Sequence, residues 1–149
     1  MKELAHIALD PLADAFTWQA FSELVERRQV KLKALLMDQG FVSGLGNIYS
    51  DEVLWAAGLL PDRRSDSLTA QEVRRLYRAM QEVLLEAVKA GGTTLEDDGY
   101  ANLYGARGAF QDQLKAYGRE GEACRRCRGR IVRARWSNRS TFYCSSCQV

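Results

Sequence analysis

The chain has 149 residues, 46% of them hydrophobic, and a formal net charge of +2. This length can bury one hydrophobic core with a small unit appended to it, and no apolar run approaches the roughly 18 residues that a membrane span needs. No cleavable apolar leader is visible in the first residues, so we expect a cytoplasmic protein with no membrane partner.

The basic residues are concentrated near the C-terminus. Residues 119–149 contain eight arginines and two glutamates, a net charge of +6, whereas the rest of the chain carries −4. Arginine pairs bidentately with phosphate, which lysine cannot do. The segment therefore predicts a face for a polyanion; the alternative is a basic hairpin that is merely solvated.

Apolar residues at helical spacing predict two helices near the N-terminus. The first covers 15–28, with Thr17 as its N-cap, and the second covers 31–39 and ends at Gly40.

A glycine-rich turn follows and leads into another helix. Gly40, Gly44 and Gly46 lie within seven residues, and a helical run at 48–57 starts directly after Asn47. Glycine permits positive φ and close approach of the backbone to a ligand, and a helix N-terminus favours phosphate. The arrangement is typical of a phosphate-binding turn, although glycines also join helix pairs for packing alone.

A capping box formed by Thr69 and Glu72 predicts the start of a long helix that ends at Gly91. Its apolar residues form a continuous stripe, which indicates core rather than a cofactor site. Three arginines lie off this stripe and are expected to be solvated: Arg74, Arg75 and Arg78. Residues 93–118 lose the periodicity and predict a long connection, of the kind that is usually functional.

Four cysteines close the sequence in two Cys-x-x-Cys pairs: Cys124, Cys127, Cys144 and Cys147. Their spacing is typical of a single tetrahedral zinc site with four thiolate ligands. A disulfide pair or a redox dithiol is the alternative, and the absence of a secretory leader disfavours it. With no ligand position left for water, we expect one structural zinc ion that does no chemistry.

Residues 131–135 and 141–143 have the composition of strands, and the turn between them would place Arg139 at or near a hairpin tip. The sequence therefore predicts a mainly α protein, with a helical domain at 1–118 followed by a four-cysteine zinc-ribbon β-hairpin at 119–149.

Several stretches together resemble one known family. Residues 33–39, 44–49 and 51–54 are similar to the helix–two-turn–helix of the formamidopyrimidine-DNA glycosylase and endonuclease VIII family, and 117–124 and 139–147 are similar to its zinc finger. The resemblance covers nearly the whole chain in collinear order and is closer to the formamidopyrimidine branch. It implies a base excision repair function, with damaged double-stranded DNA as the partner.

The resemblance also implies roles for individual residues. Lys33, Gly46 and Asn47 match family positions that contact phosphates beside the lesion, and Arg139 matches the zinc-hairpin arginine that binds phosphate near the damaged nucleotide. A further segment matches the family loop that folds over the extruded purine, namely Leu103, Tyr104, Gly105, Ala106, Arg107, Gly108, Ala109 and Phe110.

One departure from the family concerns catalysis. Family members attack the sugar with the amine of an N-terminal proline that is followed by glutamate, in a β-rich domain. Here the only prolines are Pro11 and Pro61, and the similar region starts near Asp10. We therefore expect a monomeric, nucleoid-associated bacterial chain that binds DNA without cutting it, to which a separate catalytic domain could dock.

Two alternatives remain open at this point. The first is weak AP lyase activity, in which the α-amino group of Met1 or the side chain of Lys2 serves as a surrogate amine. The second is a stand-alone zinc module that binds a protein partner or DNA without any link to catalysis.

Overall fold

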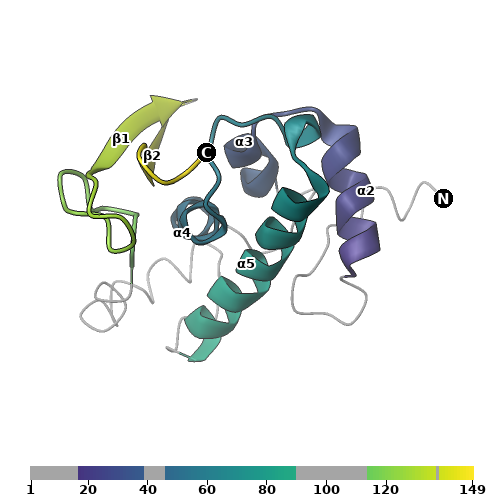
Figure 1. Cartoon of the computed structure of the whole chain (residues 1–149), viewed down its shortest axis with the longest axis horizontal. Helices are drawn as coiled ribbons and strands as arrows, with labels where there is room; N and C mark the ends of the chain where they lie inside the picture. Colours follow the sequence, from purple (N-terminus) through teal and green to yellow (C-terminus); the bar gives the residue numbers. More distant parts are fainter. Residues whose placement is uncertain (1–16, 39–45, 90–113, 137) are drawn as a thin grey trace.

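In the computed structural model of the chain, the residues described are 17–38, 46–89, 114–136 and 138–149. Their elements, in chain order, are the helices α2 (Trp18–Arg28), α3 (Leu32–Met37), α4 (Asn47–Ala57), η1 (Ser65–Ser67) and α5 (Ala70–Lys89), then the strands β1 (Ile131–Trp136) and β2 (Arg139–Cys144). The protein is thus helical with a small β-hairpin at its C-terminal end, as predicted (Figure 1). Within these ranges, no helix is long and apolar enough to span a membrane.

The helix ends follow the sequence closely. Thr17 is the N-cap of α2, and its hydroxyl accepts a hydrogen bond from the backbone N–H of Ala20 at 3.2 Å. Thr69 and Glu72 form the predicted capping box, because each side chain accepts from the backbone N–H of the other, at 3.1 and 2.9 Å. Gly58 ends α4 with a φ of +75°, a conformation that glycine adopts without steric cost.

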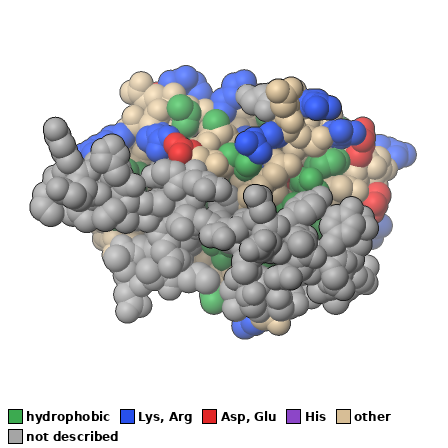
Figure 2. Space-filling view, turned by 180° about the vertical axis from the view of Figure 1, so that it is seen from behind, with side chains coloured by type: hydrophobic (Ala, Val, Ile, Leu, Met, Phe, Trp, Pro, Cys, Tyr) green, Lys and Arg blue, Asp and Glu red, His purple; other side chains and the backbone are tan. Residues whose placement is uncertain are grey.

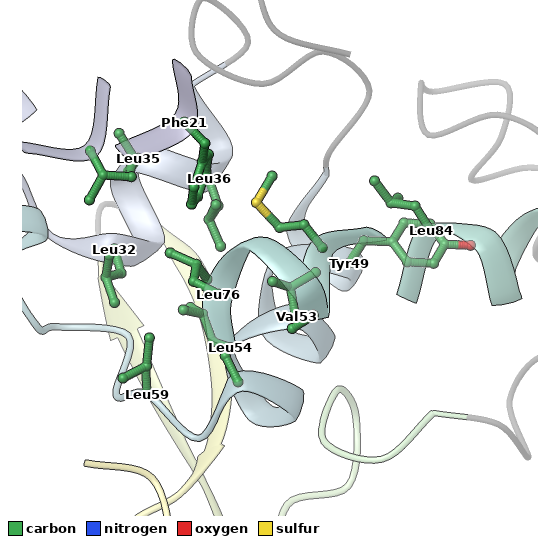
Figure 3. Close-up of a cluster of buried hydrophobic side chains, with 14 of the residues drawn as sticks. Phe21, Leu32, Leu35, Leu36, Tyr49, Val53, Leu54, Leu59, Leu76 and Leu84 are labelled. Carbon is green, nitrogen blue, oxygen red and sulfur yellow. The ribbon is translucent and has the colours of Figure 1, made fainter. Parts of the chain in front are cut away.

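The helices enclose one hydrophobic core. Leucines of α3, α4 and α5 meet Phe21 of α2 there, and Figure 3 shows Leu36, Leu54 and Leu76 gathered beside Phe21. The stripe predicted for α5 is confirmed, since Val73, Leu76, Met80 and Leu84 are buried. The arginines beside the stripe are exposed, but Arg75 also donates to the carbonyl of Ala57 at 3.0 Å, which solvation alone did not predict.

The hairpin has a second, smaller core. Strands β1 and β2 pair antiparallel, from Ile131 opposite Cys144 to Trp136 opposite Arg139, so both strands are longer than predicted. Ile131 and Phe142 pack with Trp55 of α4. In Figure 1, α4 is seen end-on between the hairpin and α5, and it contributes side chains to both cores. Helix α4 is therefore the element that joins the two parts.

Candidate nucleic-acid interface and metal centre

The four cysteines meet at one point. Their Sγ atoms all lie within 4.8 Å of one another, with 3.8 Å between those of Cys124 and Cys147 and 3.4 Å between those of Cys127 and Cys144. Four thiolates around a tetrahedral zinc, at about 2.3 Å from the metal, would be about 3.8 Å apart. The sulfur positions therefore fit one zinc ion with no ligand position left over.

Backbone geometry brings the two cysteine pairs together. Arg128 has a φ of +68°, and its N–H donates to the carbonyl of Cys124 at 2.9 Å, which closes the first pair into a tight turn. A side chain at Gly129 would place its Cβ 2.6 Å from the hydroxyl of Ser146 in the second pair. Glycine at this position lets the two turns approach closely enough to share one metal.

N–H groups surround the sulfurs. The indole Nε1 of Trp55 donates to Cys124 Sγ at 3.3 Å, and the guanidinium of Arg126 donates to Cys147 Sγ at 3.3 and 3.4 Å. Arg126 also lies 4.0 Å from the centre of the Trp55 ring and donates to the Trp55 carbonyl at 2.6 Å. Four thiolates around Zn²⁺ carry a net charge of −2, which these donors stabilise while they attach the metal centre to α4.

A buried ion pair lies where the helices meet the hairpin. Lys33 Nζ of α3 is 2.5 Å from Asp51 Oδ1 of α4, and Asp51 Oδ2 accepts from the backbone N–H of Phe142 in β2 at 2.9 Å. Burial raises the pKa of Asp51 to about 6, although the positive charge of Lys33 opposes the rise. Burial also lowers the pKa of Lys33, and Asp51 opposes that shift.

Asn47 makes a second link between α4 and the hairpin. Its side-chain amide nitrogen donates to the backbone carbonyl of Ser140 at 3.2 Å, and its backbone carbonyl accepts from Lys33 Nζ at 3.4 Å. Gly46 precedes it as the N-cap of α4 and has no side chain to accept from the N–H groups of the first turn. The positive end of the helix dipole is therefore not offset by a capping side chain. The structure thus brings Lys33, Gly46 and Asn47 together at the start of α4.

Arg139 begins β2 and is exposed, one residue before Ser140. Its position at the end of the hairpin agrees with the predicted one, and its charge is close enough to contribute to the lowered pKa of Lys33. On the face seen in Figure 2, Lys and Arg side chains are frequent along the upper edge, with few Asp or Glu among them. The predicted loop at 103–110 lies outside the described residues.

Sequence reasoning missed the residues that hold this region together: Asp51, Glu52, Trp55 and Arg126. The Glu52 carboxylate is buried and accepts three backbone N–H bonds, from Lys115, Ala116 and Tyr117, each at 2.8 Å. Burial raises the pKa of Glu52, and the three N–H bonds oppose the rise. Two adjacent carboxylates in a helix that is otherwise largely apolar were the available indication, because such groups are buried only with partners.

Comparison with known proteins agrees with this geometry. The family model of the formamidopyrimidine-DNA glycosylase H2TH domain matches residues 7–98, and that of the zinc finger found in FPG and IleRS matches residues 121–149. Taken with the sulfur positions, the second match establishes that the chain holds one structural zinc ion.

Curated relatives and solved structures are similar over almost the whole chain. Formamidopyrimidine-DNA glycosylases of Desulfitobacterium hafniense and Heliobacterium modesticaldum are 43% and 47% identical over 98% and 93% of this chain, which spans about half of their length, 53% and 50%. The crystal structure of MutM (Fpg) from Thermus thermophilus is 43% identical with a TM-score of 0.85, over 99% of this chain and 56% of that one.

A complex of Lactococcus lactis Fpg with abasic-site-containing DNA is 32% identical with a TM-score of 0.83, over 99% of this chain and 53% of that one. The family models, the identities and the matching folds agree with one another. This chain therefore belongs to the formamidopyrimidine-DNA glycosylase family.

Proposed function

We propose that this chain is the DNA-binding C-terminal portion of a formamidopyrimidine-type DNA glycosylase and AP lyase of base excision repair. It binds damaged double-stranded DNA as a monomer, through phosphates, and is not catalytic by itself. The observation that carries the proposal is the convergence of Lys33, Asn47 and the zinc hairpin at the N-terminus of α4. Solved relatives with the same fold include complexes with abasic-site-containing DNA.

In this proposal α3 and α4 are the two helices of a helix–two-turn–helix. The phosphate contacts come from Lys33, from the backbone at Gly46 and from Asn47 on one side, and from Arg139 on the other. Contacts of this kind fix the register and orientation of a duplex without reading its sequence. Support comes from the uncapped N-terminus of α4 and from the exposed Arg139 at the end of the hairpin.

We also propose the division into a helical domain at 1–118 and a zinc finger at 119–149. Support for it is that most of the hairpin core comes from the second segment, while the helical core comes almost entirely from the helices. We propose further that residues 103–110 cover the extruded base.

No proline followed by glutamate occurs in the 149-residue sequence, so we propose that a separate catalytic domain supplies the lyase chemistry.

Extrusion of a nucleotide costs a few kcal/mol, and least where the base is already lost. The zinc-loaded protein should therefore prefer a duplex with a reduced abasic-site analogue to an intact duplex in a fluorescence anisotropy titration. With roughly three to five phosphates contacted, the logarithm of the affinity should fall with the logarithm of salt at a slope near −0.9 per contact.

The same experiment separates the alternatives. A slope near zero, or no binding to either duplex, would contradict the DNA proposal and favour a protein partner. Borohydride trapping on abasic DNA tests the surrogate-amine alternative, because a Schiff base would leave a covalent adduct. We expect no adduct; an adduct that maps to Met1 or Lys2 would overturn the non-catalytic part of the proposal.

A further inference from the structure

The Asp51 side chain lies fully buried at the meeting point of three elements. It belongs to α4, one of its oxygens accepts from Lys33 Nζ of α3 at 2.5 Å, and the other accepts from the N–H of Phe142 in β2 at 2.9 Å. The residues that it joins are 18 and 91 positions away in the sequence. One carboxylate thus connects both helices of the pair to the zinc hairpin.

The Asp51 carboxylate also offsets the repulsion between two positive charges. Lys33 and Arg139 are both positive, and the Arg139 charge adds to the burial that lowers the Lys33 pKa, whereas Asp51 raises it. Two cations repel each other when they are held close together, and a carboxylate that pairs with one of them reduces the cost. The other described carboxylate near Asp51 is Glu52, whose oxygens bind the backbone at 115–117 instead.

We propose that Asp51 is a positioning residue for DNA binding, which holds Lys33 and the hairpin that carries Arg139 at a fixed separation before any DNA arrives. The proposal rests on the proposed function. It adds that Lys33 and the hairpin are already held in place when the protein folds, so that DNA binding does not have to pay the entropy of ordering them.

Asp51→Asn is the variant that tests this role with the least change in shape. Both partners of Asp51 are donors, and a carboxylate can accept from both. An amide has one accepting oxygen and one donating nitrogen, so in the variant one of the two contacts becomes a donor facing a donor. The side chain keeps its volume while the link between Lys33 and the hairpin is broken.

The expected sign opposes simple electrostatics. Removal of a negative charge beside a phosphate-binding surface should tighten binding if charge alone matters. Positioning predicts that Asp51→Asn weakens binding to the abasic duplex by about tenfold. Glu72→Gln is the matched control, because it removes the same charge from a carboxylate paired with Arg63, and we expect its affinity to equal that of the wild type.

A second readout does not involve DNA. Hydrogen exchange of the Phe142 amide should be faster in Asp51→Asn than in Glu72→Gln, while zinc content and helical circular dichroism stay at wild-type values. Wild-type protein that fails to bind DNA would refute the proposed function. Wild-type binding together with unchanged or tighter binding by Asp51→Asn would refute the positioning role alone.

Lys33→Met supplies the variant to use if Asp51→Asn does not fold. In the double variant the amide oxygen can face the Phe142 N–H, and no buried ammonium is left without a partner. We expect Asp51→Asn to change the affinity for the abasic duplex little when it is made in the Lys33→Met variant. An equal loss in both backgrounds, or failure of the double variant to fold, would reduce Asp51 to a structural residue and overturn the proposal.

Discussion

The indole of Trp55 donates a hydrogen bond to the sulfur of Cys124, a zinc ligand 69 positions later in the chain. Through this contact the last turn of α4 becomes part of the surroundings of the metal. The first turn of the same helix carries Asn47, which binds the hairpin near Arg139. The two ends of one short helix are therefore fixed to the two ends of the hairpin.

Trp55→Phe should weaken zinc binding. Phenylalanine keeps most of the ring packing but lacks the N–H that stabilises the Cys124 thiolate. Outer contacts to metal ligands typically contribute 10–100-fold to affinity, so we expect a loss of about tenfold in competitive chelator titrations. Trp136→Phe is the control, because Trp136 pairs with Arg139 at the end of the hairpin away from the cysteines. Equal zinc affinity in both variants would contradict the role of the indole.

Removal of zinc should unfold the hairpin and spare the helices. The hairpin core includes two of the zinc ligands, Cys124 and Cys144, whereas the main core is made almost entirely by helical residues. We expect Cys127→Ser, or strong chelation, to abolish protection of the hairpin amides from hydrogen exchange while helical circular dichroism persists. Loss of both signals together would mean that the helical unit depends on the metal.

The Asp51 carboxyl should titrate unusually high. Burial raises its pKa from 3.8 to about 6 in the folded protein. Between about pH 4 and pH 6 the folded state then holds a proton that the unfolded chain has released, so this group's contribution to the free energy of unfolding falls as pH rises. The Asp51 carboxyl resonance should show a midpoint near pH 6 by NMR.

The stability part of that prediction needs a reference, because other carboxyl groups titrate in the same range. As pH rises from about 4 to 6, we expect the free energy of unfolding of the wild type to fall relative to that of Asp51→Asn, as measured in urea titrations at successive pH values. A resonance midpoint near 4 would instead mean that pairing with Lys33 outweighs burial.

Arg139→Ala should weaken duplex binding and leave the fold intact. Arg139 is exposed, and its loss would remove one phosphate contact, reducing the magnitude of the salt slope by about one. Arg78→Ala is the matched control, since it removes an equally charged exposed residue from α5. Anisotropy titrations at several salt concentrations compare the two. Identical slopes would show that only net charge matters.

Leu54→Ala should destabilise the protein strongly. The Leu54 side chain is fully buried in the main core, and its truncation in such a site costs about 2–5 kcal/mol. Leu85→Ala is the matched control, because Leu85 is 48% exposed and its loss should change stability by about 0.5 kcal/mol or less. Urea unfolding of the three proteins measures the difference; similar midpoints would contradict the assignment of the core.

Local patterns were enough to predict the elements. The capping box at Thr69 and Glu72, the stripe along α5 and the N-cap Thr17 each depend on neighbours within a few residues, and all three are confirmed. The zinc ligands were also predictable, because two cysteines separated by two residues can reach the same ion wherever the rest of the chain lies.

The connections between elements were not predictable in the same way. The apolar surroundings of Asp51 in α4 indicate that it is buried, but not that its partners are Lys33 and the N–H of Phe142, because packing between distant segments determines the partners. Arg126 was counted with the basic residues, yet part of its guanidinium binds Trp55 and Cys147. Charge composition alone cannot separate arginines that face a polyanion from arginines that hold the metal site.

The length of chain between Asp51 and Phe142 has a consequence for the order of folding. The hairpin and the contact of α4 with α5 form between segments near one another in sequence, whereas the hydrogen bonds that join α4 to the hairpin and its cysteine turns span 69 to 93 residues. Contacts of such separation form late, since the entropy of closing a long loop must be overcome first. The hairpin and the helical unit should therefore form first and pack against each other last. A chain that has not completed this step would contain every arginine but would not hold the hairpin and the start of α4 side by side.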